Sequence, residues 1–195
     1  MYKTLHNLVL GFHGCSRETY EKVLINHEEL SKSMNDYDWL GNGIYFWENS
    51  YARALEWAER FKKDEGPSVI GAVIDLGYCL NLSDYGCTEV LSSVYGLLSE
   101  ECQMEGIGLP ENGGKDSLKP FRRLDCAVIE RLHKLNQEIE QSEYDSVRGI
   151  FFEGKPIYPN AGFLDKTHIQ ICVRNPNCIK GYFSPKEYNK KFARI

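Results

Sequence analysis

The stretch that decides the fold is LGNGIYFWENSYARALEWAERF, residues 40–61. Residues 43–47, a glycine followed by one isoleucine and three aromatic side chains, are typical of a β-strand. Asn49 or Ser50 can then cap a helix, since both side chains accept hydrogen bonds from free backbone N–H groups. The apolar residues of that helix recur at i, i+3, i+4 and i+7, which places them on one buried stripe: Ala54, Trp57, Ala58 and Phe61. The stretch therefore predicts an aromatic strand that leads directly into an amphipathic helix.

Two further apolar segments flank this unit. Residues 7–12 predict a short, largely buried strand that enters a tight turn at residues 13–16. Ser16 can cap the helix that follows the turn. Residues 31–43 are mostly polar with two glycines before the aromatic strand, so they predict a loop. Residues 68–75 are apolar on both faces and predict a central strand.

The second half of the chain predicts two helices followed by two strands. Residues 86–105 and 122–140 predict helices, with a loop rich in glycine and proline between them. Residues 147–153 and 167–173 predict two more strands. Strands early, helices in the middle and strands again late indicate an α+β fold with a mostly antiparallel or mixed sheet and flanking helices. The length and the lack of an internal linker predict that residues 1–195 form a single domain.

The charge pattern restricts the partners of the protein. A formal net charge of −5 argues against a generic binder of nucleic acid. Residues 179–195 are basic, with a local charge of +4, so this tail is either a solvated end or a short contact for a phosphate backbone. No apolar run approaches the ~20 residues that a membrane span needs, and the first residues contain no secretory segment. We therefore expect a cytoplasmic protein with no membrane partner.

The cysteines and histidines do not predict a metal site. The seven cysteines are an odd number without a C-x-x-C pair, so we expect reduced thiols that pack as small hydrophobic side chains. The five histidines have no H-x-H or H-x-x-x-H spacing, and we expect no protein-bound metal. The chain also lacks the glycine-rich patterns of the Rossmann and P-loop folds, which excludes these two routes to nucleotide binding.

Polar side chains lie at the ends of the predicted strands. His13 and Gly14 follow the first strand, so an imidazole is exposed beside a glycine backbone that can pair with a planar amide. Tyr45 offers an aromatic face on the second strand. His168 and Gln170 alternate along the last strand and should point to the same side of the sheet. Polar groups are costly to bury without partners, so these residues predict a cleft.

The order of these motifs resembles the NAD-binding core of the ADP-ribosyltransferase superfamily. Residues 12–16 (FHGCS) resemble its H-G-[ST] turn, and residues 40–46 (LGNGIYF) resemble its G-x-G-[IV]-Y-F strand. The branch is the His-Tyr-Glu one, which includes diphtheria toxin and the poly(ADP-ribose) polymerases. The resemblance covers residues 8–60 and, more loosely, 165–183. It implies an ADP-ribosyltransferase-like domain with a split sheet, which takes NAD as ADP-ribose donor and needs no metal.

The resemblance also implies a role for each residue. His13 would hydrogen-bond the 2′-hydroxyl of a ribose in NAD, and Gly14 would hold the nicotinamide carboxamide through its backbone. Tyr45 would stack on the nicotinamide ring. Trp57, one residue out of register with the second tyrosine of the family, would form the opposite wall. Without the resemblance, Tyr45 and Trp57 read as core aromatic residues and His13 as a residue that closes a turn.

Two residues depart from the family pattern. Cys15 stands in the donor-binding turn where the family has Ser or Thr, and a thiol is a weak hydrogen-bonding group. Gln170 stands where a Glu is expected; it could hold a ribose hydroxyl but can neither act as a base nor supply negative charge. His168 could orient or deprotonate the acceptor, and Glu153, at the end of the preceding strand, is the reserve candidate for the carboxylate. These differences disfavour the elongation of polymer chains.

The function that these residues indicate is mono-ADP-ribosyl transfer from NAD to a macromolecular acceptor, either a protein or a nucleic acid. By analogy, such an enzyme could act as a bacterial or phage toxin or defence effector, and an antitoxin could then be a partner. Two alternatives stay open. One is an NAD glycohydrolase with the same fold, and the other is a catalytically inactive module that binds NAD or ADP-ribose, which Gln170 favours.

Overall fold

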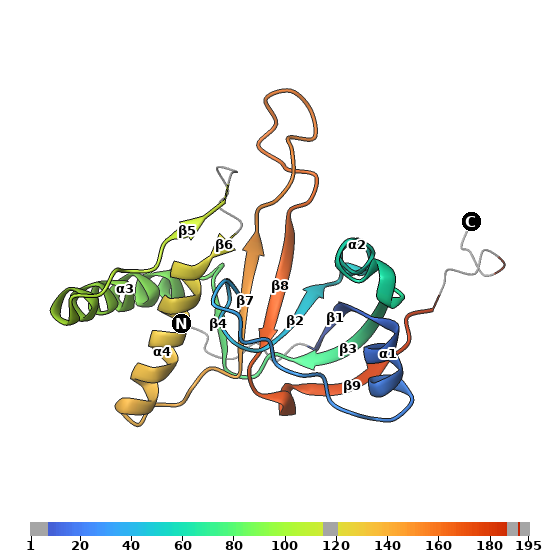
Figure 1. Cartoon of the computed structure of the whole chain (residues 1–195), viewed down its shortest axis with the longest axis horizontal. Helices are drawn as coiled ribbons and strands as arrows, with labels where there is room; N and C mark the ends of the chain where they lie inside the picture. Colours follow the sequence, from blue (N-terminus) through green and yellow to red (C-terminus); the bar gives the residue numbers. More distant parts are fainter. Residues whose placement is uncertain (1–7, 115–120, 187–190, 192–195) are drawn as a thin grey trace.

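The centre of the fold is a seven-stranded sheet with strand order β4-β7-β8-β2-β1-β3-β9 (Figure 1). The computed structural model describes residues 8–114, 121–186 and 191. The strands of this sheet are β1 (Leu8–Cys15), β2 (Ile44–Glu48), β3 (Ser68–Asp75), β4 (Cys79–Asn81), β7 (Ser146–Phe151), β8 (His168–Val173) and β9 (Ile179–Phe183). Neighbouring strands pair antiparallel except β4 and β7, which are parallel. The sheet is therefore mixed and mostly antiparallel, as predicted.

Helices cover both ends of this sheet (Figure 1). They are α1 (Arg17–Leu24), α2 (Tyr51–Phe61), α3 (Tyr85–Glu105) and α4 (Arg123–Glu138), with short 3-10 turns η1 (Lys63–Glu65) and η2 (Pro176–Cys178). Helices α3 and α4 pack together beside β4, and a small hairpin of β5 (Asn112–Gly113) and β6 (Phe121–Arg122) adjoins them. Helices α1 and α2 lie at the other end. The protein thus has the α+β class that the sequence predicted.

Side-chain alternation in β2 separates the core from the opposite face of the sheet. Ile44 and Phe46 are completely buried and pack with the apolar residues of α1 and β3. Tyr45 and Trp47 point to the other face, where Trp47 packs against Ala54 of α2. Successive side chains of a strand point to opposite faces, so the alternation of β2 fixes which aromatic residues are available for a ligand.

The first strand is longer than the sequence predicted. His13, Gly14 and Cys15 do not form a turn but continue β1, because they pair with Ile70, Val69 and Ser68 of β3. The helix cap that follows is confirmed: Thr19 N donates to Ser16 Oγ at 3.2 Å at the start of α1. The predicted turn was wrong because pairing with a distant strand holds the glycine in an extended conformation.

Other boundaries also differ from the prediction. Residues 179–183 of the basic tail form β9, which pairs with β3; residues 187–190 and 192–195 of that tail lie outside the described part. Glu153 lies two residues beyond the end of β7. Ser50 is the N-cap of α2 but makes no side-chain capping hydrogen bond. Phe61 leaves the buried stripe of α2 and is 54% exposed, because α2 ends there.

The cysteines behave as the sequence predicted. All seven are buried and none forms a disulfide. Burial raises the pKa of the Cys15 thiol to about 11, so it stays protonated at neutral pH. In the described ranges, no helix combines the length and apolar character needed to cross a membrane.

Candidate functional site

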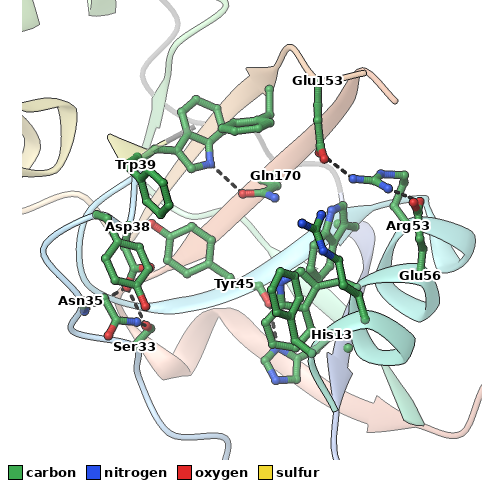
Figure 2. Close-up of a pocket in the computed structure, with 18 of the residues that line it drawn as sticks. His13, Ser33, Asn35, Asp38, Trp39, Tyr45, Arg53, Glu56, Glu153 and Gln170 are labelled. Atoms are coloured by element: carbon green, nitrogen blue, oxygen red, sulfur yellow. Dashed lines mark hydrogen bonds and ion pairs between the residues drawn. The ribbon is translucent and has the colours of Figure 1, made fainter. Parts of the chain in front are cut away.

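A cavity of about 1060 Å³ opens between β1, β2, β8, α2 and the loop that precedes β2 (Figure 2). This volume reaches the upper end of the roughly 300–1,000 Å³ typical of small-molecule sites. Six of the residues singled out in the sequence line it: His13, Gly14, Tyr45, Trp57, Glu153 and Gln170. Cys15 and His168 do not line it. The chain therefore brings residues from five separate segments to one cavity: β1, β2, α2, the residues after β7, and β8.

The cavity begins where β1 and β2 part. Their antiparallel pairing ends at Phe12 and Trp47, whereas β1 stays paired with β3 up to Cys15. The backbone of Gly14 consequently lies at the cavity wall without a β2 neighbour in the ladder. A Cβ atom at Gly14 would lie 2.3 Å from the Ala54 carbonyl oxygen, so glycine is required for α2 to pack this closely.

His13 fills the opening between the two strands. Its Nδ1 donates a hydrogen bond to the Tyr45 carbonyl oxygen at 2.8 Å, since a carbonyl can only accept. Burial lowers the pKa of His13, so the ring is neutral at pH 7. The Nε2 atom then carries a lone pair and can accept a hydrogen bond from a hydroxyl group in the cavity.

Tyr45 lies in the middle of the cavity wall, between the loop residues and His13 (Figure 2). Its hydroxyl donates to the Gly41 carbonyl oxygen at 2.8 Å and accepts from Leu40 N at 2.9 Å. Burial raises the pKa of this phenol well above its usual value. The hydroxyl therefore fixes the loop and does not act as an acid or base, which leaves the ring as the part of Tyr45 that a ligand can contact.

Gln170 projects into the cavity, and two residues hold its amide; Figure 2 shows the bond from Trp39. Trp39 Nε1 donates to Gln170 Oε1 at 2.6 Å. Gln170 Nε2 lies 3.0 Å from His168 Nε2, and His168 Nδ1 donates to the Lys166 carbonyl oxygen at 2.7 Å. His168 Nε2 must therefore accept from Gln170, in agreement with a His168 pKa that burial lowers. His168 is 7% exposed and lies behind Gln170, where it orients the amide.

The opposite wall carries a chain of charges. Arg53 Nη2 donates to Glu153 at 2.6 Å, and Arg53 also pairs with Glu56, which pairs in turn with Lys166. These pairs connect α2 to both ends of the β7–β8 connection, which projects from the sheet in Figure 1. The carboxylate of Glu153 thus lines the cavity but is held by a guanidinium. The sequence analysis did not single out Arg53, although this residue lies one helical turn before Trp57 on the same face.

An aromatic wall continues from this side. Trp47 and Trp57 lie with ring centroids 6.0 Å apart, and Phe61 lies 5.3 Å from Trp57. All three line the cavity. The Trp47 Nε1–H is buried without a hydrogen-bond partner among the described residues. This N–H is too enclosed to reach a ligand in the cavity, so the wall presents the aromatic rings alone.

The loop before β2 supplies residues that the sequence did not single out. Ser33 Oγ donates to Asp38 Oδ2 at 2.5 Å, and Asn35 N donates to the same oxygen at 3.1 Å. A contact with α4 fixes the end of the loop, because Asn42 N donates to Glu130 at 2.7 Å. Trp39 also belongs to this loop. In the sequence, its position as a large aromatic residue within a polar segment was the one signal that it could line a site.

The described residues contain no group of three His, Cys, Asp or Glu side chains that could hold a metal ion. Cys15 is 3% exposed and packs in the core with α1, so its thiol cannot contact a ligand in the cavity. The Cys15 side chain therefore cannot replace the hydroxyl that a Ser or Thr would offer at this position.

We expect acid to destabilise the protein through its buried histidines. Burial lowers the pKa of His13, His133 and His168 in the folded state. Between these lowered values and the unfolded value near 6.5, the unfolded chain binds more protons, so the free energy of unfolding falls as the pH falls. Each histidine contributes at most about 1.4 kcal/mol per pH unit in that window. Urea unfolding between about pH 7 and about pH 5 measures the slope, and His133→Gln should reduce it. A flat profile would contradict this prediction.

Comparisons with known proteins assign no activity. No family model matches the chain, and no solved structure matches it. An uncharacterized protein of Methanocaldococcus jannaschii is 26% identical over 188 residues, which cover 87% of this chain and 83% of that protein. A functional interpretation therefore depends on the residues of the site.

Proposed function

We propose that this protein is a mono-ADP-ribosyltransferase that uses NAD as the donor. The single observation that carries the proposal is the convergence of His13, Gly14, Tyr45, Trp57 and Gln170 on one cavity. These residues come from β1, β2, α2 and β8. Their order along the chain resembles the His-Tyr-Glu branch of the ADP-ribosyltransferases.

The residues support a particular pose of the donor. Nicotinamide would stack between Tyr45 and Trp57, with its carboxamide on the Gly14 backbone. His13 Nε2 would accept a hydrogen bond from a ribose hydroxyl. The bond from Nδ1 to the Tyr45 carbonyl oxygen fixes the tautomer that leaves Nε2 free to accept. The Gln170 amide would contact the nicotinamide ribose with its second N–H, since Trp39 and His168 hold its other positions.

The reaction needs no redox step. The bond between the ribose C1′ and the nicotinamide nitrogen breaks through an oxocarbenium-like state, and the bond electrons leave with nicotinamide. An oxygen or nitrogen nucleophile of the acceptor then bonds to C1′ and releases its proton to solvent or to a nearby base. The site contributes orientation and ordered dipoles. Gln170 supplies no negative charge, and Glu153 is neutralised by Arg53, so a single transfer is favoured over chain elongation.

The acceptor is a macromolecule, either a protein or a nucleic acid, and the biological setting is that of a cytoplasmic toxin or defence effector with an antitoxin as partner. Two other functions use the same site. In an NAD glycohydrolase, water would attack C1′. In an inactive module, NAD or ADP-ribose would bind without cleavage, and Gln170 in place of a carboxylate favours this second candidate.

Incubation of the protein and a cell extract with NAD labelled on the adenine side tests the proposal. We expect the label to move to a macromolecule, and digestion with protease or nuclease then identifies the acceptor class. Label in free ADP-ribose alone would indicate a glycohydrolase. Label that stays in NAD, although NAD binds, would indicate the inactive module and contradict the proposed transferase.

A further inference from the structure

We propose that Arg60 binds the diphosphate of the dinucleotide and thereby makes the site selective for dinucleotides over nicotinamide riboside. The inference rests on the proposed function and adds a specificity residue to it. Arg60 lies in the last turn of α2, and no resemblance or sequence motif pointed to it. Its side chain lines the cavity.

The charge balance of the cavity singles out this residue. The charged residues that line it are Asp38, Arg53, Glu56, Arg60 and Glu153. Arg53 is neutralised by its pairs with Glu56 and Glu153. Arg60 forms no ion pair with any residue in the described ranges, so it is the one lining cation there whose charge is not balanced by a carboxylate. A diphosphate carries negative charge that an acidic cavity would otherwise repel.

The guanidinium of Arg60 is also held in place. It lies 5.0 Å above the Phe61 ring, and Phe61 packs against Trp57. A guanidinium over an aromatic face keeps its N–H groups free at the edge of its plane, where they can form two parallel hydrogen bonds to phosphate oxygens. The stack thus orients the charge before the ligand arrives.

The position along α2 agrees with the proposed pose. Arg60 follows Trp57 by three residues, which is a rise of about 4.5 Å and places both side chains on neighbouring parts of one helix face. In NAD, one ribose separates nicotinamide from the diphosphate. If nicotinamide stacks on Trp57, the diphosphate lies within reach of a side chain as long as arginine one turn further along α2.

Calorimetry on the full chain tests the inference with NAD, ADP-ribose and nicotinamide riboside, which lacks the diphosphate. We expect Arg60→Ala to weaken the binding of NAD and ADP-ribose about tenfold to a hundredfold, which is the range for a lost charge-assisted hydrogen bond. The affinity for nicotinamide riboside should stay unchanged. Salt should weaken NAD binding more in the parent protein than in the variant. Arg17→Ala is the matched control, because Arg17 also lies 5.0 Å over a ring, that of Tyr20, but outside the cavity and paired with Glu21.

The following results would overturn the inference. Equal affinity of the parent and Arg60→Ala for NAD would remove Arg60 from the donor site while the proposed function stands. An equal loss of affinity for all three ligands would show that Arg60 only supports the packing of Phe61 and Trp57. If Arg60→Ala leaves NAD affinity unchanged but raises the KM for a nucleic-acid acceptor, Arg60 contacts acceptor phosphates instead. Failure of the parent to bind or cleave NAD would overturn the proposed function itself, and this inference with it.

Discussion

Replacing Gln170 with alanine is expected to lower ADP-ribosyl transfer about a hundredfold while the fold stays intact, because the amide that we propose to face the ribose is lost and Trp39 and His168 each lose a hydrogen bond. Trp39 Nε1 and His168 Nε2 both hydrogen-bond this amide. Single-turnover transfer of labelled ADP-ribose measures the effect, and circular dichroism monitors the fold. Unchanged transfer would leave Gln170 with a structural role only, and the role of the expected Glu would pass to His168 or Glu153.

The Gln170→Glu variant separates a ribose-binding role from a purely structural one. A carboxylate keeps the acceptor for Trp39 and adds charge that favours an oxocarbenium, so NAD cleavage should be retained or raised. It cannot donate to His168, however, and the new charge should raise the pKa of His168. The resulting ion pair exists below that raised pKa and is lost above it. Because a protonated His168 would neutralise the new carboxylate, as Arg53 neutralises Glu153, we expect the activity of this variant to rise as the pH rises through that pKa, whereas the parent protein should not show this rise.

Trp39→Phe is the matched test of the orientation of Gln170. Phenylalanine keeps an aromatic side chain, but it removes the N–H donor together with the outer part of the indole ring, whose Cη2 and Cζ3 atoms lie against Gly149. Transfer should fall about tenfold, the cost of a buried hydrogen bond, with little change in the affinity for NAD. A loss of thermal stability equal to that of Gln170→Ala, without a change in turnover, would contradict the positioning role.

The second large effect is expected at His13, where two substitutions test the roles of the two ring nitrogens separately. In His13→Asn the amide nitrogen can replace Nδ1 and keep the bond to the Tyr45 carbonyl, but nothing replaces Nε2. In His13→Gln the longer side chain can replace Nε2 in the cavity but not Nδ1. We expect His13→Asn to stay as stable as the parent and to lose about tenfold to a hundredfold in NAD turnover, corresponding to an unpaired ribose hydroxyl.

His13→Gln should instead lose stability and keep part of the turnover. NAD consumption and urea unfolding, measured on both variants, give the comparison. Full activity in His13→Asn would show that His13 only closes the gap between β1 and β2. The proposed donor pose would then lose its contact to the ribose.

The sequence determined the elements whose signals are local. The apolar run of residues 68–75 predicts β3 with its observed bounds, because a strand buried on both faces has no polar interruption. Helix α1 begins where Ser16 predicts it, since a cap acts on its own first turn. The pairing of His168 with Gln170 on one face of β8 also follows from alternation alone. Each of these depends on residues that are neighbours in the chain.

Tertiary structure decided the rest. The sequence predicted a turn at His13 and Gly14, but pairing with β3 extends them, and the energy of that pairing comes from residues more than fifty positions away. Gln170 takes its orientation from Trp39, 131 residues away, and Glu153 is neutralised by Arg53, 100 residues away. Side-chain periodicity reports which face of an element is buried, but it carries no information on which distant element supplies a hydrogen bond or a charge to that face. The sequence therefore predicted five strands of the sheet, apart from the end of β1, and six residues that line the cavity, whereas only the folded chain determined β4, β9 and the partners of the cavity residues.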